Sequence, residues 1–277
     1  MNTAGRDWID AMPQELSGQQ ALLRRLLAAC EATDSIRWLV VACSVGRGAA
    51  DRYSDLDLGM GIKDDVFETA LGDVRKVIDG LGPLVDSYHH QMPGRALRHE
   101  RIFAQYANRC QIDLVVIPAS QSVGPVRDEV MLYNQGEHEV VAFEQPTLTP
   151  EQLREWAFAG WCALADFGKY LRRGSVWEAL QRLHEARDWA WRLWAAVLDV
   201  PNPHFGLTSI LDFAPGMLPA GMEPTVSDLE PASLLAAARN VAEQLNQAAE
   251  RLPAGQRALL PAAMARYVSA DLAELTA

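Results

Sequence analysis

Two aspartates, Asp55 and Asp57, stand one residue apart in the stretch CSVGRGAADRYSDLDLGMGI, residues 43–62. Residues i and i+2 of a β-strand point to the same face, so a strand here presents both carboxylates together while Leu56 and Leu58 enter the core. Like charges held that close cost free energy unless a cation lies between them. Paired oxygen donors suit Mg²⁺, which completes its shell with water and phosphate. The pair therefore predicts a magnesium site.

The turn before this pair and a third acid after it fit the same chemistry. Ser44 follows a buried apolar run and lies in a small-residue turn, whose N–H groups and hydroxyl can cradle phosphate oxygens. Capping of a following helix is a compatible role for this serine. Asp113 interrupts the apolar stretch CQIDLVVIP, where an unpaired carboxylate is expensive. A strand antiparallel to its neighbour would bring Asp113 alongside the pair as a third metal ligand.

This pattern resembles the signature of the DNA polymerase β-like nucleotidyltransferase superfamily, in which a Gly-Ser turn, a spacer of about this length and Asp-x-Asp precede a third aspartate. Cys43 stands where that family usually has glycine. The resemblance implies catalytic and metal-binding roles for Asp55, Asp57 and Asp113, with Mg²⁺ and with ATP or another NTP as co-substrate. Ser44 is then expected to grip the β- and γ-phosphates.

The size of the chain and its helical second half are similar to those of the aminoglycoside and lincosamide nucleotidyltransferases, the antibiotic adenylyltransferases. This likeness implies an enzyme that transfers AMP to a hydroxyl of a small cationic acceptor and releases pyrophosphate. It also implies a phosphate contact from Lys169 in the helical half, although an i,i+3 ion pair with Asp166 explains that lysine equally well. The base stays open among Asp113, Glu100 and Asp166.

Two alternative functions remain beside this one. The first keeps the chemistry and changes the acceptor to a protein side chain or an RNA end. The second is a binding module, a nucleotide-binding regulator or antitoxin-like partner without turnover. The three aspartates favour an enzyme, because a silenced site usually loses one of them.

The elements expected around these residues form two domains. We expect an α/β (α+β) domain with a mixed sheet at 1–146 and an all-α helical bundle at 147–277. In the first domain we predict helices at 17–32 and from Asp64 to Gly80 or Gly82, and strands at 36–43, 56–62, 82–90, 101–110, 111–118 and 138–145, with a hairpin around Asn108. In the second we predict helices at 149–174, 175–200, 228–252 and from 254 to the end.

Composition limits the setting and the partners. The 277 residues carry 25 basic and 36 acidic side chains, a net charge of −11 that disfavours nucleic acid and suits a cationic small molecule. No apolar run is long enough to span a bilayer, and no signal peptide is evident. The four cysteines form no CxxC pair, which disfavours zinc and disulfides. We therefore expect a cytoplasmic monomer or homodimer.

Overall fold

The computed structural model describes residues 3–91, 99–121, 128–136, 138 and 147–276. Contacts within the chain separate two units, Met1–Glu144 and Gln145–Ala277, and each is described by itself. In the part of the chain that is described, no helix is long and apolar enough to cross a membrane.

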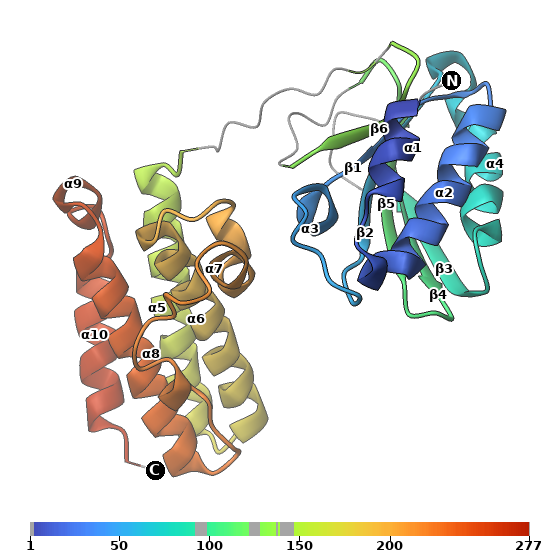
Figure 1. Cartoon of the computed structure of the whole chain (residues 1–277). Coiled ribbons are helices and arrows are strands. Elements are labelled where there is room, and N and C mark those ends of the chain that lie inside the picture. Colours follow the sequence, from blue (N-terminus) through green and yellow to red (C-terminus); the bar gives the residue numbers. More distant parts are fainter. Residues whose placement is uncertain (1–2, 92–98, 122–127, 137, 139–146, 277) are drawn as a thin grey trace. The chain divides into compact units, whose positions relative to one another are not determined.

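The first unit is built on a six-stranded mixed sheet in the order β3-β4-β5-β2-β1-β6 (Figure 1). Neighbouring strands are antiparallel except β2 and β5, which are parallel. The predicted hairpin is confirmed, since β4 and β5 are antiparallel neighbours and Arg109 turns the chain at φ 72°. The strands are β1 Ile36–Val41, β2 Leu56–Ile62, β3 Leu84–Gln91, β4 Glu100–Tyr106, β5 Gln111–Pro118 and β6 Val130–Asn134.

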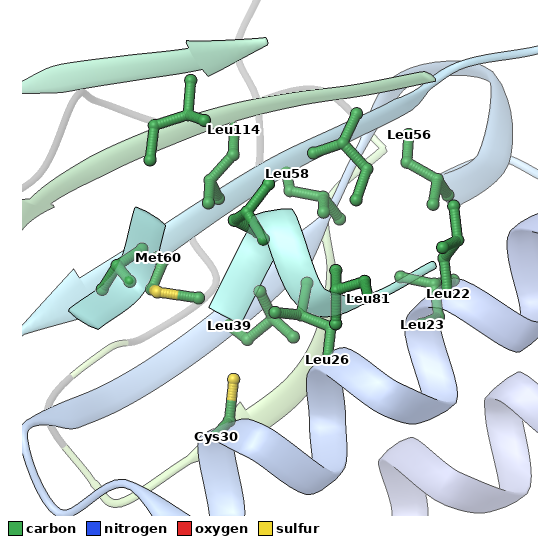
Figure 2. Packing of buried hydrophobic residues seen from close by; sticks show 14 of the residues in the cluster. Leu22, Leu23, Leu26, Cys30, Leu39, Leu56, Leu58, Met60, Leu81 and Leu114 are labelled. Atoms are coloured by element: carbon green, nitrogen blue, oxygen red, sulfur yellow. The ribbon is translucent and has the colours of Figure 1, made fainter. Parts of the chain in front are cut away.

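The long helices of this unit pack on one face of the sheet (Figure 1). They are α1 Thr3–Asp10, α2 Ser17–Ala32 and α4 Phe67–Gly80. Helix α2 repeats apolar residues at helical spacing, so Leu22, Leu26 and Cys30 line one side of it. Those side chains meet Leu39 and Met60 from the inward positions of β1 and β2 (Figure 2). This core fixes which side of each strand faces away from the helices.

The opposite face of the sheet carries a smaller apolar cluster and the polar residues of interest. Trp38, Val40, Ile117 and Ala119 are buried there. A Cβ added at Gly61 would lie 2.1 Å from Trp38 Nε1, which means that the indole rests directly on the glycine backbone of β2. The absence of a side chain at this position therefore gives the tryptophan its place.

The second unit is helical throughout its described residues. Helix α5 begins with a capping box, in which Thr149 Oγ1 accepts from the Gln152 N–H over 3.2 Å and Gln152 Oε1 accepts from the Thr149 N–H over 2.9 Å. Gly174, at φ 70°, separates α5 from α6. The helices are α5 Pro150–Arg172, α6 Val176–Val197, α7 Leu207–Phe213, α8 Pro231–Arg251, α9 Ala254–Arg257 and α10 Ala262–Glu274.

Five short helical segments complete the described structure. They are α3 Cys43–Gly46, η1 Gln14–Leu16, η2 Asp64–Val66, η3 Pro203–Phe205 and η4 Glu223–Thr225.

Several sequence predictions fail in informative ways. Neither helix α1 nor strand β6 was predicted from the sequence. The prediction of a single helix from Ala254 onward is wrong, because the chain forms two helices, α9 and α10, with Pro261 at the N-cap of the second. Beyond His138, the strand expected at 138–145 lies outside the described residues.

Candidate active site

Asp57 and Asp113 lie side by side on the face of the sheet opposite the long helices. They are register partners on the parallel strands β2 and β5, which corrects the expectation of an antiparallel neighbour. Both residues line a cavity of about 200 Å³. Their neighbours along the strands, Leu56, Leu58 and Leu114, point into the helix-covered core, as the alternation of a strand requires.

The carboxyl group of Asp57 is held in an unfavourable electrostatic setting. Burial, the charge of Asp55 and the charge of Asp113 together raise its pKa from 3.8 to about 6, against the opposing effects of a hydrogen bond from Cys43 and the charge of Arg101. A carboxylate so placed gains more from an added cation than an ordinary surface acid does. Asp55 lies one residue before β2, and its charge is the largest cause of the raised pKa after burial.

Asp113 has a cationic partner within the protein. Arg101 Nε donates to Asp113 Oδ1 over 2.8 Å, and Arg101 Nη2 donates to Asp113 Oδ2, which completes a two-pronged ion pair. The guanidinium also lies over the ring of Phe103, 4.5 Å from its centroid. Asp113 is thus neutralised by β4, whereas Asp57 has no comparable ion pair among the described contacts.

The side chains near Asp57 limit which residues can hold the predicted magnesium ion. Within the described ranges, no cluster of three or more histidine, cysteine, aspartate or glutamate side chains is arranged to hold a metal ion. The oxygen donors of Asp55 and Asp57, with the raised pKa of Asp57, fit one divalent cation that takes its other ligands from water and phosphate. Asp113 already accepts from Arg101 through both of its oxygens, so its charge is offset within the protein and it gains less from a cation than Asp57 does.

The turn before the aspartates joins β1 to the short helix α3. Cys43 adopts φ 55°, a left-handed conformation that favours glycine, the residue usual at this position in the family that the sequence resembles. Burial and the nearby Asp57 raise the pKa of the Cys43 thiol to about 12, so the thiol stays protonated and donates to Asp57. Ser44 lies inside α3, whose N-cap is Ala42 without a side-chain hydrogen bond, so the capping role for Ser44 is wrong.

The loop that precedes Asp55 is hydrogen-bonded to helix α2. Gln19 is almost fully buried, and its Nε2 donates to the Ser54 carbonyl oxygen over 2.9 Å. The turn that precedes Ser54 is held by Asp51, whose Oδ1 accepts from the Tyr53 N–H over 2.8 Å. These contacts fix the backbone immediately before the two aspartates.

Glu100, Asp166 and Lys169 are the remaining candidates from the sequence. Glu100 is buried on the helix-covered side of β4, where Arg75 Nε donates to its Oε1 over 2.6 Å, so it is turned away from Asp113. Lys169 belongs to the second unit, and its Nζ is 2.5 Å from Asp166 Oδ1. Both side chains of that pair are more than 40% exposed, at 42% and 44%. The described contacts of Lys169 are those of a solvated helix face.

Four polar or aromatic residues of the cavity had no role in the sequence predictions: Trp38, Arg101, Glu129 and His138. Arg101 left one usable signal, since a lone arginine at an outward position of the strand ERIFAQY needs a partner. Glu129 and His138 left none, because their meeting depends on how β6 returns along β1.

Comparison with known proteins adds little to this geometry. No family model matches the chain, and no curated protein matches it. Among solved structures, the chain is similar to an aminoglycoside 6-adenyltransferase from Bacillus subtilis, with 11% sequence identity over 90% of this chain and 97% of that one and a TM-score of 0.34.

Proposed function

We propose that the chain is a magnesium-dependent nucleotidyltransferase. It moves a nucleoside monophosphate from a nucleoside triphosphate, AMP from ATP in the family that the sequence resembles, to a hydroxyl of a small acceptor of the aminoglycoside type. The observation that carries the proposal is the placement of Asp57 beside Asp113 on adjacent strands and next to Asp55, where burial and these two charges raise its pKa to about 6 and favour a bound cation. Crowded acids of this kind destabilise a sheet face, and carboxyl groups with perturbed pKa values cluster at functional sites.

In this proposal, the carboxylates of Asp55 and Asp57 bind the metal. When bound there, Mg²⁺ would offset charge on the triphosphate and on the departing pyrophosphate. The turn at Cys43 and Ser44 presents backbone N–H groups to phosphate oxygens. Arg101 can exchange one two-pronged oxyanion partner for another, from the Asp113 carboxylate to a phosphate group, because both suit its planar guanidinium.

That exchange would leave Asp113 able to act as the base. Its carboxylate takes the proton of the acceptor hydroxyl, the hydroxyl oxygen forms a bond to the α-phosphorus, and the bond from the α-phosphorus to the bridging oxygen breaks. Pyrophosphate leaves with the electron pair of that bond. The net charge of −11 and the carboxylates of the cavity favour an acceptor that carries amino groups.

The test is pyrophosphate release from Mg²⁺ and each of ATP, GTP, CTP and UTP, with a panel of aminoglycosides and lincosamides as acceptors. D57N should abolish acceptor-dependent release, and D73N, at an exposed site on α4, should leave it unchanged. Equal release from wild type and D57N would overturn the assignment. Release with a peptide or an RNA end in place of the antibiotics would keep the chemistry and change the acceptor.

A second candidate, the nucleotide-binding regulator, is favoured by the ion pair of Asp113 with Arg101. In such a protein the third carboxylate would stay neutralised by Arg101 and no base would be released. Calorimetric binding of Mg²⁺-nucleotide without pyrophosphate release from any acceptor would support this candidate. Acceptor-dependent release would exclude it.

A further inference from the structure

The cavity that contains Asp57 extends along β2 to an aromatic platform. Trp38 of β1 is in register with Gly61, which is four residues beyond Asp57, a distance of about 13 Å at roughly 3.3 Å per residue. The indole lies against the bare backbone of Gly61, and its Nε1 donates to the Ala119 carbonyl oxygen over 3.2 Å. One face of the ring is therefore fixed against the sheet.

An imidazole ring is stacked on this tryptophan. The ring centroids of Trp38 and His138 are 4.3 Å apart, and the ring planes are inclined by 24°. The Nε2 atom of His138 is 2.8 Å from Glu129 Oε1. The side chains of His138 and Glu129 are only 12% and 4% exposed, so the imidazole joins an aromatic face to a buried carboxylate.

The surroundings of Glu129 define what can bind there. Val40, Val115 and Ile117 form apolar walls of the same cavity. A carboxylate is an acceptor only, and in an apolar setting it needs N–H or O–H donors. A flat group that lies on Trp38 and turns two adjacent N–H donors toward Glu129 would satisfy both features at once.

We propose that this part of the cavity is a ring-binding site in which the imidazole of His138 holds the place of a ligand. The ligand is a flat group with two adjacent N–H donors, which displaces His138, stacks on Trp38 and donates to Glu129. The guanine base of a nucleotide has such an edge in its N1–H and 2-amino groups, and so has a guanidinium group on an acceptor. Adenine does not, because its N1 is an acceptor. The inference rests on the proposed function and, in its guanine form, changes the expected nucleotide from ATP to GTP.

Calorimetric titration of the full chain with the Mg²⁺ complexes of GTP, ITP and ATP tests the guanine form. Wild type should bind GTP at least about tenfold more tightly than ATP, with ITP between them because it lacks the 2-amino group. E129Q should reverse the order, since an amide oxygen and an amide N–H₂ match the 6-amino group and N1 of adenine. E15Q, at an exposed site in η1, should leave the order unchanged.

H138A tests the displacement itself. Removal of the imidazole should tighten GTP binding several-fold, because no ring has to leave the tryptophan and Glu129 gains its partner only in the complex. A residue with a structural or catalytic role would weaken binding or leave it unchanged when removed. H89A, at an exposed position of the edge strand β3, is the matched control and should have no effect.

The guanidinium source is tested by titration with methylguanidine and by its competition with guanidino-bearing acceptors. Binding that E129Q abolishes, together with equal affinities for GTP and ATP, would keep the site and assign it to the acceptor. If no ligand of either kind responds to E129Q, and H138A tightens none, the inference is overturned. Acceptor-dependent pyrophosphate release in that case would still support the proposed function, so the two can fail separately.

Discussion

The replacement of Asp57 by asparagine should make the metal-free protein more stable, and only above pH 4. In the folded chain, burial and the charges of Asp55 and Asp113 raise the Asp57 pKa to about 6, against 3.8 for the unfolded chain. The folded state therefore binds this proton more tightly than the unfolded state does. The stability from this protonation is fully present below pH 3.8 and is lost as the pH rises through 6. Asparagine has no such loss.

The size of the effect follows from the shift. About two pKa units at about 1.36 kcal/mol each give roughly 3 kcal/mol as an upper bound. Because Asp57 is partly open to solvent, screening reduces this to roughly 1–2 kcal/mol of unfolding free energy at pH 8. For a chain of this size, that corresponds to an increase in the unfolding temperature of about 2–6 °C.

Thermal unfolding of wild type and D57N in chelator-treated buffer, at intervals from pH 3.5 to 8, measures this difference. The two curves should coincide at pH 3.5 and separate above it. Millimolar Mg²⁺ should close the gap at pH 8 by stabilising wild type alone. D113N should behave oppositely at pH 8 and lower the stability, because it leaves the partly buried Arg101 without its carboxylate. A D57N gap that is equal at pH 3.5 and pH 8, or one of opposite sign, would refute this electrostatic account of the site.

Three further predictions concern the backbone around the site, and each is checked by chemical or thermal unfolding. C43G should leave the free energy of unfolding unchanged or raise it by up to about 1 kcal/mol, because φ 55° suits glycine, whereas C43V should lower it by about 1–2 kcal/mol. G61A should cost about 3 kcal/mol, because its Cβ would meet Trp38 at 2.1 Å, while the matched G72A on open helix surface should stabilise by about 0.5–1 kcal/mol. Q19L should cost about 1–3 kcal/mol and reduce the Mg²⁺-dependent stabilisation, since it frees the loop that carries the aspartates.

Local patterns were sufficient for the parts of the sequence that carry one strong signal. Helix α2 and strand β2 have their predicted bounds, Ser17–Ala32 and Leu56–Ile62, because helical spacing and strand alternation are each complete there. The proximity of Asp113 to Asp57 was also predicted, since an unpaired carboxylate in an apolar strand is costly and Asp113 therefore needs a polar partner. The parallel direction of β2 and β5 was not predicted, because it depends on the path of the chain through β3 and β4, which lie between them in the sequence.

The parts that sequence could not supply are set by contacts between distant segments. Arg101 meets Asp113 because β4 and β5 are antiparallel with Phe103 opposite Asp113, a register that a single sequence does not encode locally. Glu129 and His138 flank β6, a five-residue strand too short to show a pattern. Their contact exists only once β6 lies beside β1 and presents them to Trp38.

The two carboxylates at the centre of the site differ in a way that bears on how such a site works. Asp113 has its own counter-ion in Arg101, with which it forms a two-pronged ion pair. Asp57 has neighbours of its own sign, and its ionisation is unfavourable until a cation arrives. Under the proposed function, one binding step would change the surroundings of both carboxylates, because a triphosphate with its metal would bring a cation to Asp57 and an oxyanion to Arg101 together. Binding would then free Asp113 at the moment when an acceptor proton has to be taken. The crowding that destabilises the protein without its metal would then be the source of its selectivity for a metal-bound substrate over either component alone.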